Sequence, residues 1–292
     1  MLVGLSKTRT IRLFLLSLLL QTALSSCFAR TPNGNAATVA NPVVPVSEND
    51  PLTVVLNSGP QGSKTLKAWD LPAFQKLKSA STREKDPETG EVVSWRGPML
   101  SHLIDQALEG LTVAERAQID LVILRNAKGT QAFVPRFLIS RYPLMMAWER
   151  GSREPGLGPR GPWYSIVPWT SKPRILEEQL PLERYFVPGL RQIELTNYRN
   201  LYSAYFLKKQ TDPLAMRGEK IFMQNCLGCH NPSQAPNIAS ADPTKSRVLA
   251  TQGQHATVKG VPQLEAKQWR ALINYFEAFR SETAGGTASA SQ

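Results

Sequence analysis

Short apolar runs separated by turn residues follow one another from about residue 52 to residue 195. Alternating or uninterrupted apolar runs predict β-strands, and apolar residues at helical spacing predict helices. We expect one helix, at residues 99–108, and strands at residues 52–56, 91–95, 120–124, 132–134, 163–167 and 191–195. Several short strands with few helices predict a mixed α+β domain.

The pattern changes after residue 196. Aromatic residues at helical spacing predict a short helix within residues 197–210, and further helices are expected at residues 216–224 and 263–280. The stretch between the last two helices is polar and contains few apolar side chains. Two helices around such a stretch make a poor core unless a large group fills the middle. We therefore expect an all-α domain built around a bound group.

The first residues have the pattern of an export signal. Three basic residues within positions 7–12 precede an apolar run at 13–20, which is too short to span a bilayer. Residues 24–27 have the form of a bacterial lipobox, which predicts a lipid on Cys27. Cleavage before Arg30 and an uncleaved anchor are the alternatives. Each of them puts the rest of the chain outside the cytoplasmic membrane, so a periplasmic location is expected.

Composition narrows the function classes. Among 292 residues, 42% are hydrophobic, which excludes a wholly disordered chain. The 34 Lys and Arg residues against 23 Asp and Glu give a net charge of +11, which suits acidic partners or an anionic membrane surface. Because the cations are scattered rather than gathered in a dense basic run, no nucleic-acid partner is expected.

The strongest chemical signal is the motif Cys226-Leu-Gly-Cys229-His230. Two thiols separated by two residues lie on one side of a helical turn and can bind both vinyl groups of one porphyrin, while the next histidine binds the iron. The motif therefore predicts one covalently bound haem c. A zinc site would need four ligands, and a thioredoxin-like redox pair would need a βαβ setting that this region lacks.

The residues around the motif resemble class I cytochromes c over about 70 residues. In that family the first and last helices cross at a small residue and an aromatic one. The resemblance implies that Gly218, Phe222, Leu272 and Tyr275 form this crossing in the present chain.

The second iron ligand departs from the family, which uses a methionine after the motif. No Met follows Cys226 in this chain, and His255 lies close to where the family places its methionine. We expect His230 and His255 to bind the iron together. An open distal position, and Lys259 or Met223 as ligand, are the alternatives. In the family a proline carbonyl orients the proximal histidine, and the candidates here lie at positions 232 and 236.

Three segments of the first region, at residues 95–100, 142–147 and 160–163, resemble the molybdopterin-binding domain of the sulfite-oxidase type. Active members bind molybdenum through one cysteine thiolate, and residues 51–196 contain no Cys. No molybdopterin is therefore expected. The segments are explained by turns and core packing, or by an altered anion pocket in which Arg96, Arg136 and Arg160 would bind an oxyanion. His102 is expected to be a helix-surface or core histidine.

These observations predict an α+β fold class, with a sulfite-oxidase-like mixed α/β domain followed by an all-α cytochrome c domain. The expected segments are a signal peptide (1–29), a flexible linker (30–50), the first domain (51–196), a connecting helix (197–210), the cytochrome c domain (211–281) and a disordered tail (282–292). The expected function is one-electron transfer to a redox protein, either another cytochrome or a dehydrogenase, with the first domain docking the partner. No catalytic residue is expected. A haem enzyme acting on a small substrate, an oxidoreductase subunit and a haem sensor stay open.

Overall fold

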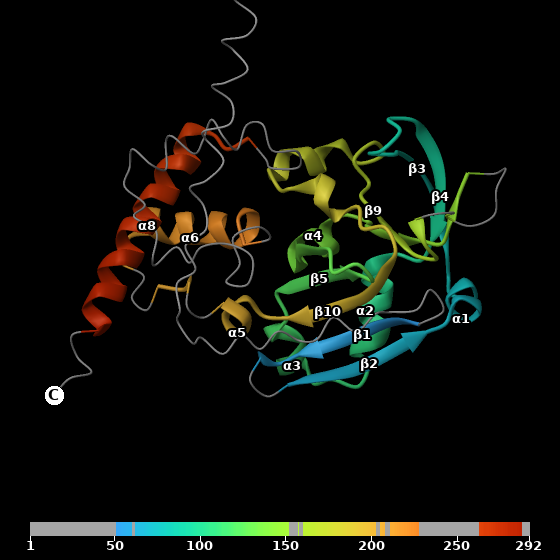
Figure 1. Cartoon of the computed structure of the whole chain (residues 1–292), viewed down its shortest axis with the longest axis horizontal. Helices are drawn as coiled ribbons and strands as arrows, with labels where there is room; N and C mark the ends of the chain where they lie inside the picture. Colours follow the sequence, from blue (N-terminus) through green and yellow to red (C-terminus); the bar gives the residue numbers. More distant parts are fainter. Residues whose placement is uncertain are drawn as a thin grey trace, which may run out of the picture. The chain divides into compact units, whose positions relative to one another are not determined.

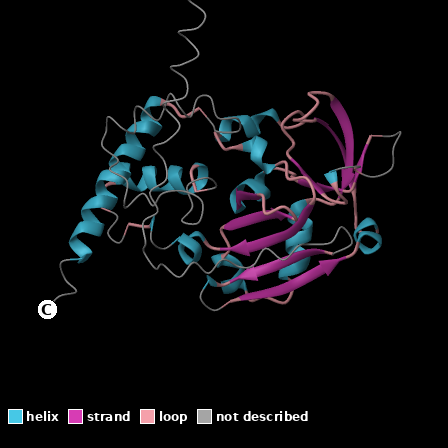
Figure 2. Ribbon diagram, viewed as in Figure 1, coloured by secondary structure: helices cyan, strands magenta, loops and turns pink. Residues whose placement is uncertain are grey.

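The structure of the chain is a computed structural model that describes residues 51–59, 62–151, 157, 160–202, 205–207, 211–227 and 263–287, the last six of these by their backbone only. The described residues belong to one compact unit and form a mixed α/β fold with several sheets (Figures 1 and 2). The strands are β1 (Leu52–Asn57), β2 (Ser63–Trp69), β3 (Ala80–Lys85), β4 (Val92–Gly97), β5 (Leu121–Asn126), β6 (Gln131–Pro135), β7 (Met145–Ala147), β8 (Glu149–Arg150), β9 (Tyr164–Ile166) and β10 (Leu190–Thr196). The α-helices are α1 (Leu71–Gln75), α2 (Leu100–Leu108), α3 (Val113–Gln118), α4 (Arg136–Arg141), α5 (Tyr198–Tyr202), α6 (Pro213–Asn225) and α8 (Ala266–Thr287), and the 3₁₀ helices are η3 (Pro173–Glu178) and η4 (Leu182–Tyr185).

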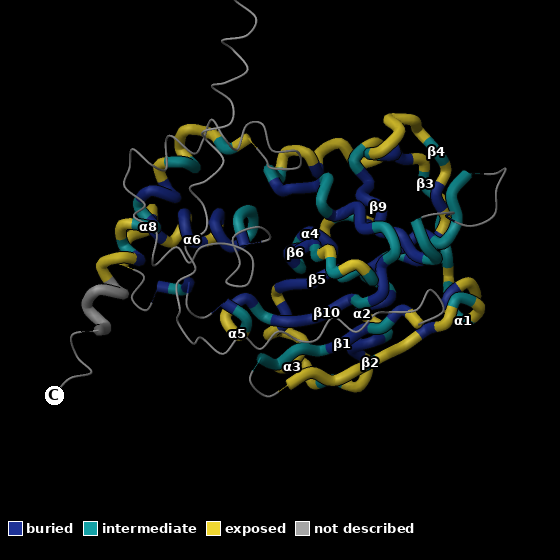
Figure 3. Tube along the Cα trace, viewed as in Figure 1, coloured by how far each residue is buried: buried dark blue, intermediate teal, exposed yellow. Residues whose placement is uncertain are grey.

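The main sheet has five strands in the order β2-β1-β10-β5-β6. The pairing of β1 with β10 is parallel, and the other neighbours are antiparallel. The central strands β1, β10 and β5 are largely buried, whereas the edge strand β2 is mostly exposed (Figure 3). Charged side chains such as Lys64 and Lys67 on the edge strand protect it from pairing with other chains.

Two smaller sheets extend this core. Strands β3, β4 and β8 form an antiparallel sheet, and β7 pairs with β9. Two buried carboxylates fasten β3 and the turn after it. Glu84 accepts hydrogen bonds from the N–H of Thr170 at 2.7 Å and from Ser171. Asp86 accepts from the Arg150 guanidinium at 2.8 Å. A buried carboxylate is stable only when it has such partners. The hydrogen bonds of Glu84 and Asp86 therefore attach the β3–β4 hairpin to residues 150, 170 and 171.

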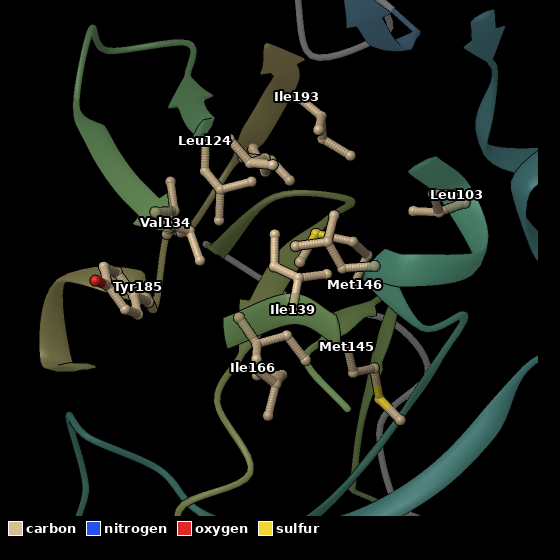
Figure 4. Packing of buried hydrophobic residues seen from close by; sticks show 14 of the residues in the cluster. Leu103, Leu124, Val134, Ile139, Met145, Met146, Ile166, Tyr185 and Ile193 are labelled. Carbon is tan, nitrogen blue, oxygen red and sulfur yellow. The ribbon is translucent and has the colours of Figure 1, made fainter. Parts of the chain in front are cut away.

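A first hydrophobic cluster lies on one face of the main sheet. Alternate residues of β5 and β6, among them Leu124 and Val134, point into it together with Ile193 of β10. Helix α2 has apolar residues at helical spacing and covers this face with its buried side, which includes Leu103. Figure 4 shows these side chains around Met146. The burial of about three dozen apolar side chains here is the main stabilising contribution of the fold.

A second hydrophobic cluster lies on the other side of β5 and β6. Successive strand residues point to opposite faces. Leu121, Ile123 and Phe133 therefore point away from the first cluster and belong to the second. There they pack in one cluster with residues of α5, α6 and α8. The sheet therefore contributes an apolar wall to the C-terminal helices.

The expected fold class is wrong because of this second cluster. It placed an all-α domain after the first domain, and an all-α domain would have a helical core of its own. In the part of the chain that the structure describes, α6 and α8 instead share their core with β5 and β6. The alternation along β5 gives the sheet two apolar faces, and one of them belongs to the same cluster as residues of these helices.

The structure confirms each strand expected from the sequence and the helix at 99–108, with ends that differ by a few residues. It adds elements that the pattern did not predict, notably β2 and β3. Both are exposed strands with polar residues at most positions, so they lack the apolar signal of a buried strand. Among the described residues, no helix is both long and apolar enough to cross a membrane.

Candidate functional site

The first cysteine of the Cys-x-x-Cys-His motif lies at the end of helix α6. The helix begins with Pro213, and the carboxylate of Asp212 accepts the N–H of Leu214 at 2.9 Å as an N-terminal cap. At the other end the N–H of Cys226 donates to the carbonyl of Phe222 at 2.9 Å. The last turn of α6 therefore fixes the backbone of Cys226, whose side chain is half-buried.

Helices α6 and α8 cross in direct backbone contact at Gly218. A Cβ atom at this position would lie 2.0 Å from the carbonyl oxygen of Ala271 and 2.7 Å from the Cβ of Tyr275. Only glycine permits this approach. The crossing expected for Gly218, Phe222 and Tyr275 is confirmed, and Leu272 is buried in the same cluster.

Aromatic rings fill the space on one side of the crossing. The rings of Phe222 and Tyr275 are stacked, with centroids 5.5 Å apart. Phe222 also contacts Tyr205 at 5.8 Å, and Tyr275 contacts Phe279 at 5.8 Å. Such pairs add about 1 kcal/mol each beyond the burial of their area. They join α6, α8 and the segment at residues 205–207 into one aromatic group.

Two polar contacts attach that segment to the helices. The Tyr275 hydroxyl donates to the carbonyl of Tyr205, and the N–H of Leu207 donates to the buried carboxylate of Glu219 at 2.9 Å. Burial raises the pKa of Tyr275, and the charge of Glu219 acts in the same direction. The phenol is therefore protonated at neutral pH and serves as a donor.

The sequence analysis did not single out Glu219. The signal was present, because Ala215, Gly218, Glu219 and Phe222 follow the spacing of one helix face and all four are buried. A carboxylate on an apolar face needs a donor nearby. The donor is a backbone N–H in the segment that precedes α6, and sequence spacing does not reveal such a contact.

Of the predicted haem-binding residues, the structure describes only Cys226. Cys229, His230 and His255 lie outside the described residues, as does the alternative ligand Lys259. Met223, another alternative, is buried in the second cluster. Among the described residues, no group of three or more His, Cys, Asp or Glu side chains is placed to hold a metal ion.

The described surroundings of Cys226 fit a large apolar group. The thiol belongs to residues packed against the second cluster, beside the aromatic group of Phe222 and Tyr275. The next residue, Leu227, is fully buried. The side-chain oxygen of Asn225 is buried without a hydrogen-bond partner in the described structure. A thiol at the edge of an apolar cluster suits covalent attachment of a porphyrin rather than coordination of a hydrated ion.

The three arginines of the first region do not share one site. Arg160 pairs with the buried Asp86 at 3.0 Å and with Glu88 at 2.7 Å. Arg96 lies over the Trp148 ring and 3.7 Å from Glu149. These two guanidiniums have carboxylate partners, which argues against a shared oxyanion pocket.

Arg136 differs from the other two. One of its terminal nitrogens is buried without a hydrogen-bond partner in the described structure. Burial lowers the pKa of Arg136, although the charge of Asp105 opposes this effect. His102 lies on α2, where its ring is 3.3 Å from the Gln106 side chain, as expected for a helix histidine.

Comparison with known proteins gives no relative: no family model matches the chain, and no curated protein matches it. The functional argument therefore depends on the residues and their geometry.

Proposed function

We propose that this chain is an exported, periplasmic c-type haem protein that transfers single electrons to and from a redox protein. The observation that carries the proposal is the Cys-x-x-Cys-His motif, whose first cysteine ends a helix beside an aromatic cluster. Cys226 and Cys229 would bind one haem, and His230 and His255 would bind its iron. The haem supplies an iron centre that alternates between the ferric and ferrous states.

The described residues would position the first attachment point. The Phe222 carbonyl accepts the N–H groups of Cys226 and Leu227, at 2.9 and 3.3 Å. The ring of the same Phe222 is stacked on Tyr275 of α8. Because Gly218 lets the two helices touch, the position of the thiol is tied to both of them. A rigid site reduces the reorganisation that accompanies each change of oxidation state.

Two histidine ligands favour simple electron transfer. Imidazole in place of a thioether stabilises ferric iron and lowers the reduction potential relative to His/Met ligation. A six-coordinate iron leaves no position for a substrate or gas. The proposed partner is another cytochrome or a dehydrogenase, and the proposed lipid on Cys27 would keep the protein at a membrane.

The attachment is tested by haem staining after denaturing electrophoresis of the exported protein. Cys226→Ser with Cys229→Ser should abolish the covalent haem signal. Cys27→Ser is the control, because it replaces the one cysteine outside the motif and should retain the stain. Haem staining that persists in the double variant would contradict the proposal.

The ligand set is tested by optical spectra of both oxidation states, with and without carbon monoxide. We expect a low-spin spectrum that carbon monoxide barely alters. In His255→Ala the iron should become high-spin and bind carbon monoxide. A high-spin spectrum or ready carbon monoxide binding in the unmodified protein would refute His255 as a ligand and favour a haem enzyme or sensor.

A further inference from the structure

One face of the sheet formed by β3, β4 and β8 carries exposed cations. Along β3 the exposed residues alternate with more buried ones, and Arg83 and Lys85 point to the exposed side, opposite to the buried Glu84. Ser81 is exposed on the same side of β3 as Arg83 and Lys85. Arg96 of β4 lies directly opposite Ser81, and residues opposite each other on paired strands share a face, so Arg96 lies on this side too. We call this surface, defined by Arg83, Lys85 and Arg96, the cationic face.

The cations of this face have few acidic partners. Opposite charges across neighbouring strands normally stabilise an exposed sheet. Arg83 lies opposite Ser94. Arg96 lies between Ser81 of β3 and Glu149 of β8. Within the described part of the chain, neither Arg83 nor Lys85 forms an ion pair. Among the described residues, the acidic contact of this face is Glu149, which lies 3.7 Å from an Arg96 side chain that is 55% exposed.

Strand β3, which carries Arg83 and Lys85, is attached to the rest of the molecule by several hydrogen bonds. The N–H of Lys85 donates to the Thr170 hydroxyl at 3.0 Å, and its carbonyl accepts the Trp169 ring N–H at 3.0 Å. On the reverse side, Glu84 and Asp86 are fully buried and hydrogen-bonded. The backbone therefore holds Arg83 and Lys85 on the same side of β3, where an external anionic surface would neutralise their charge.

We infer that the cationic face binds an anionic lipid surface. The short side chains of Ser81 and Ser94 lie across from the arginines, so no bulky group stands opposite them on the sheet. Val92, on the same side as Lys85, is 47% exposed and adds an apolar contact. A face with three exposed cations and one exposed apolar side chain suits a surface of phosphate headgroups.

The magnitude explains why this face would act as a second attachment. Each Lys or Arg near an anionic membrane contributes about 1 kcal/mol, or roughly fivefold in binding. Three cations alone bind weakly, so the cationic face would add a weak, salt-sensitive contact to the stronger membrane attachment given by the proposed diacylated Cys27. The inference does not involve the haem, so its failure and the failure of the proposed function are separable.

The test measures binding of the Cys27→Ser protein, which lacks the proposed lipid, to vesicles by sedimentation, at low and at physiological salt; the further variants below are made in this background. One set of vesicles is pure phosphatidylcholine, and the other contains equal amounts of phosphatidylglycerol and phosphatidylcholine. The test variant is Arg83→Gln with Lys85→Gln. The matched control is Lys64→Gln with Lys67→Gln, which removes the same charge from exposed positions of β2. Circular dichroism verifies that both variants are folded.

We expect tighter binding to the anionic vesicles, weakened by salt. Loss of two cations should reduce that binding at least tenfold in the test variant, by the same fivefold factor per charge, and leave the control near the unmodified protein. Equal losses in the two variants would refute the inference, because net charge alone would then explain binding. Absence of binding to anionic vesicles would also refute it. Binding of soluble polyglutamate instead would assign the face to an acidic protein.

Discussion

Replacing Gly218 by alanine tests the contact between α6 and α8. The added Cβ would lie 2.0 Å from the Ala271 carbonyl oxygen and 2.6 Å from its carbon. Both atoms belong to the backbone of α8, so no side-chain rotation can relieve the clash. To reach an ordinary contact of 3.4 Å, the two helices must separate by about 1.4 Å at this point.

Two opposing effects set the size of the change. Alanine favours a helix over glycine by about 1 kcal/mol. Forcing an extra carbon into a packed core costs about 1–3 kcal/mol, and more where only the backbone can yield. Separation of the helices would also weaken the stacking of Phe222 on Tyr275, which contributes about 1 kcal/mol. We expect a net loss of about 2 kcal/mol in the free energy of unfolding.

The assay is equilibrium unfolding in urea, followed by circular dichroism. Gly110→Ala is the matched control, because nothing lies within 4 Å of its added Cβ and the residue is not in the left-handed region. The control should change stability by less than about 0.5 kcal/mol. If Gly218→Ala is no less stable than this control, the close crossing of α6 and α8 is wrong.

Three further changes test other parts of the structure. Burial alone would raise the pKa of Asp86, but the Glu88 N–H and two arginines outweigh it and hold the pKa below its usual 3.8. Its stabilisation is therefore full above pH 3.8 and is lost as the pH falls through the lowered pKa. In urea unfolding as a function of pH, Asp86→Asn should be about 3–5 kcal/mol less stable at neutral pH, with a smaller loss on acidification. An unchanged acid profile would contradict this role. Tyr275→Phe removes the hydrogen bond to Tyr205 and should cost about 1 kcal/mol in the same assay, whereas a neutral change would show that this bond contributes nothing. Phe133→Ala should cost about 3–5 kcal/mol while unfolding stays a single transition, because the sheet and the C-terminal helices share one cluster. Separate transitions for the sheet and the helices would refute that shared core.

Strands and helices could be predicted from the sequence wherever an apolar run or a regular apolar spacing marks them. The apolar run at the start of β5 predicted a buried strand, and the spacing in residues 99–108 predicted helix α2. The crossing at Gly218 followed from a family resemblance, because a small residue and an aromatic one recur at the required positions. The exposed strands β2 and β3 were missed, because polar residues at most positions give no period.

The candidate site divides in the same way. The sequence by itself carries the basis of the proposed chemistry: a Cys-x-x-Cys-His motif is contained in five neighbouring residues, and its spacing is meaningful without knowledge of distant contacts. The sequence also determined that residues 51–196 have no cysteine to bind molybdenum.

Only the tertiary structure decided which surface covers which. The apolar residues of β5 face both sides, and nothing in their spacing shows that Leu121 and Ile123 pack with α6 and α8. The partners of Glu219 and Asp86 come from other elements of the chain. A repeat along the sequence reports which side of an element is apolar. Which element packs against that side depends on the fold of the whole chain, because the same apolar face can be buried equally well against a helix or a sheet.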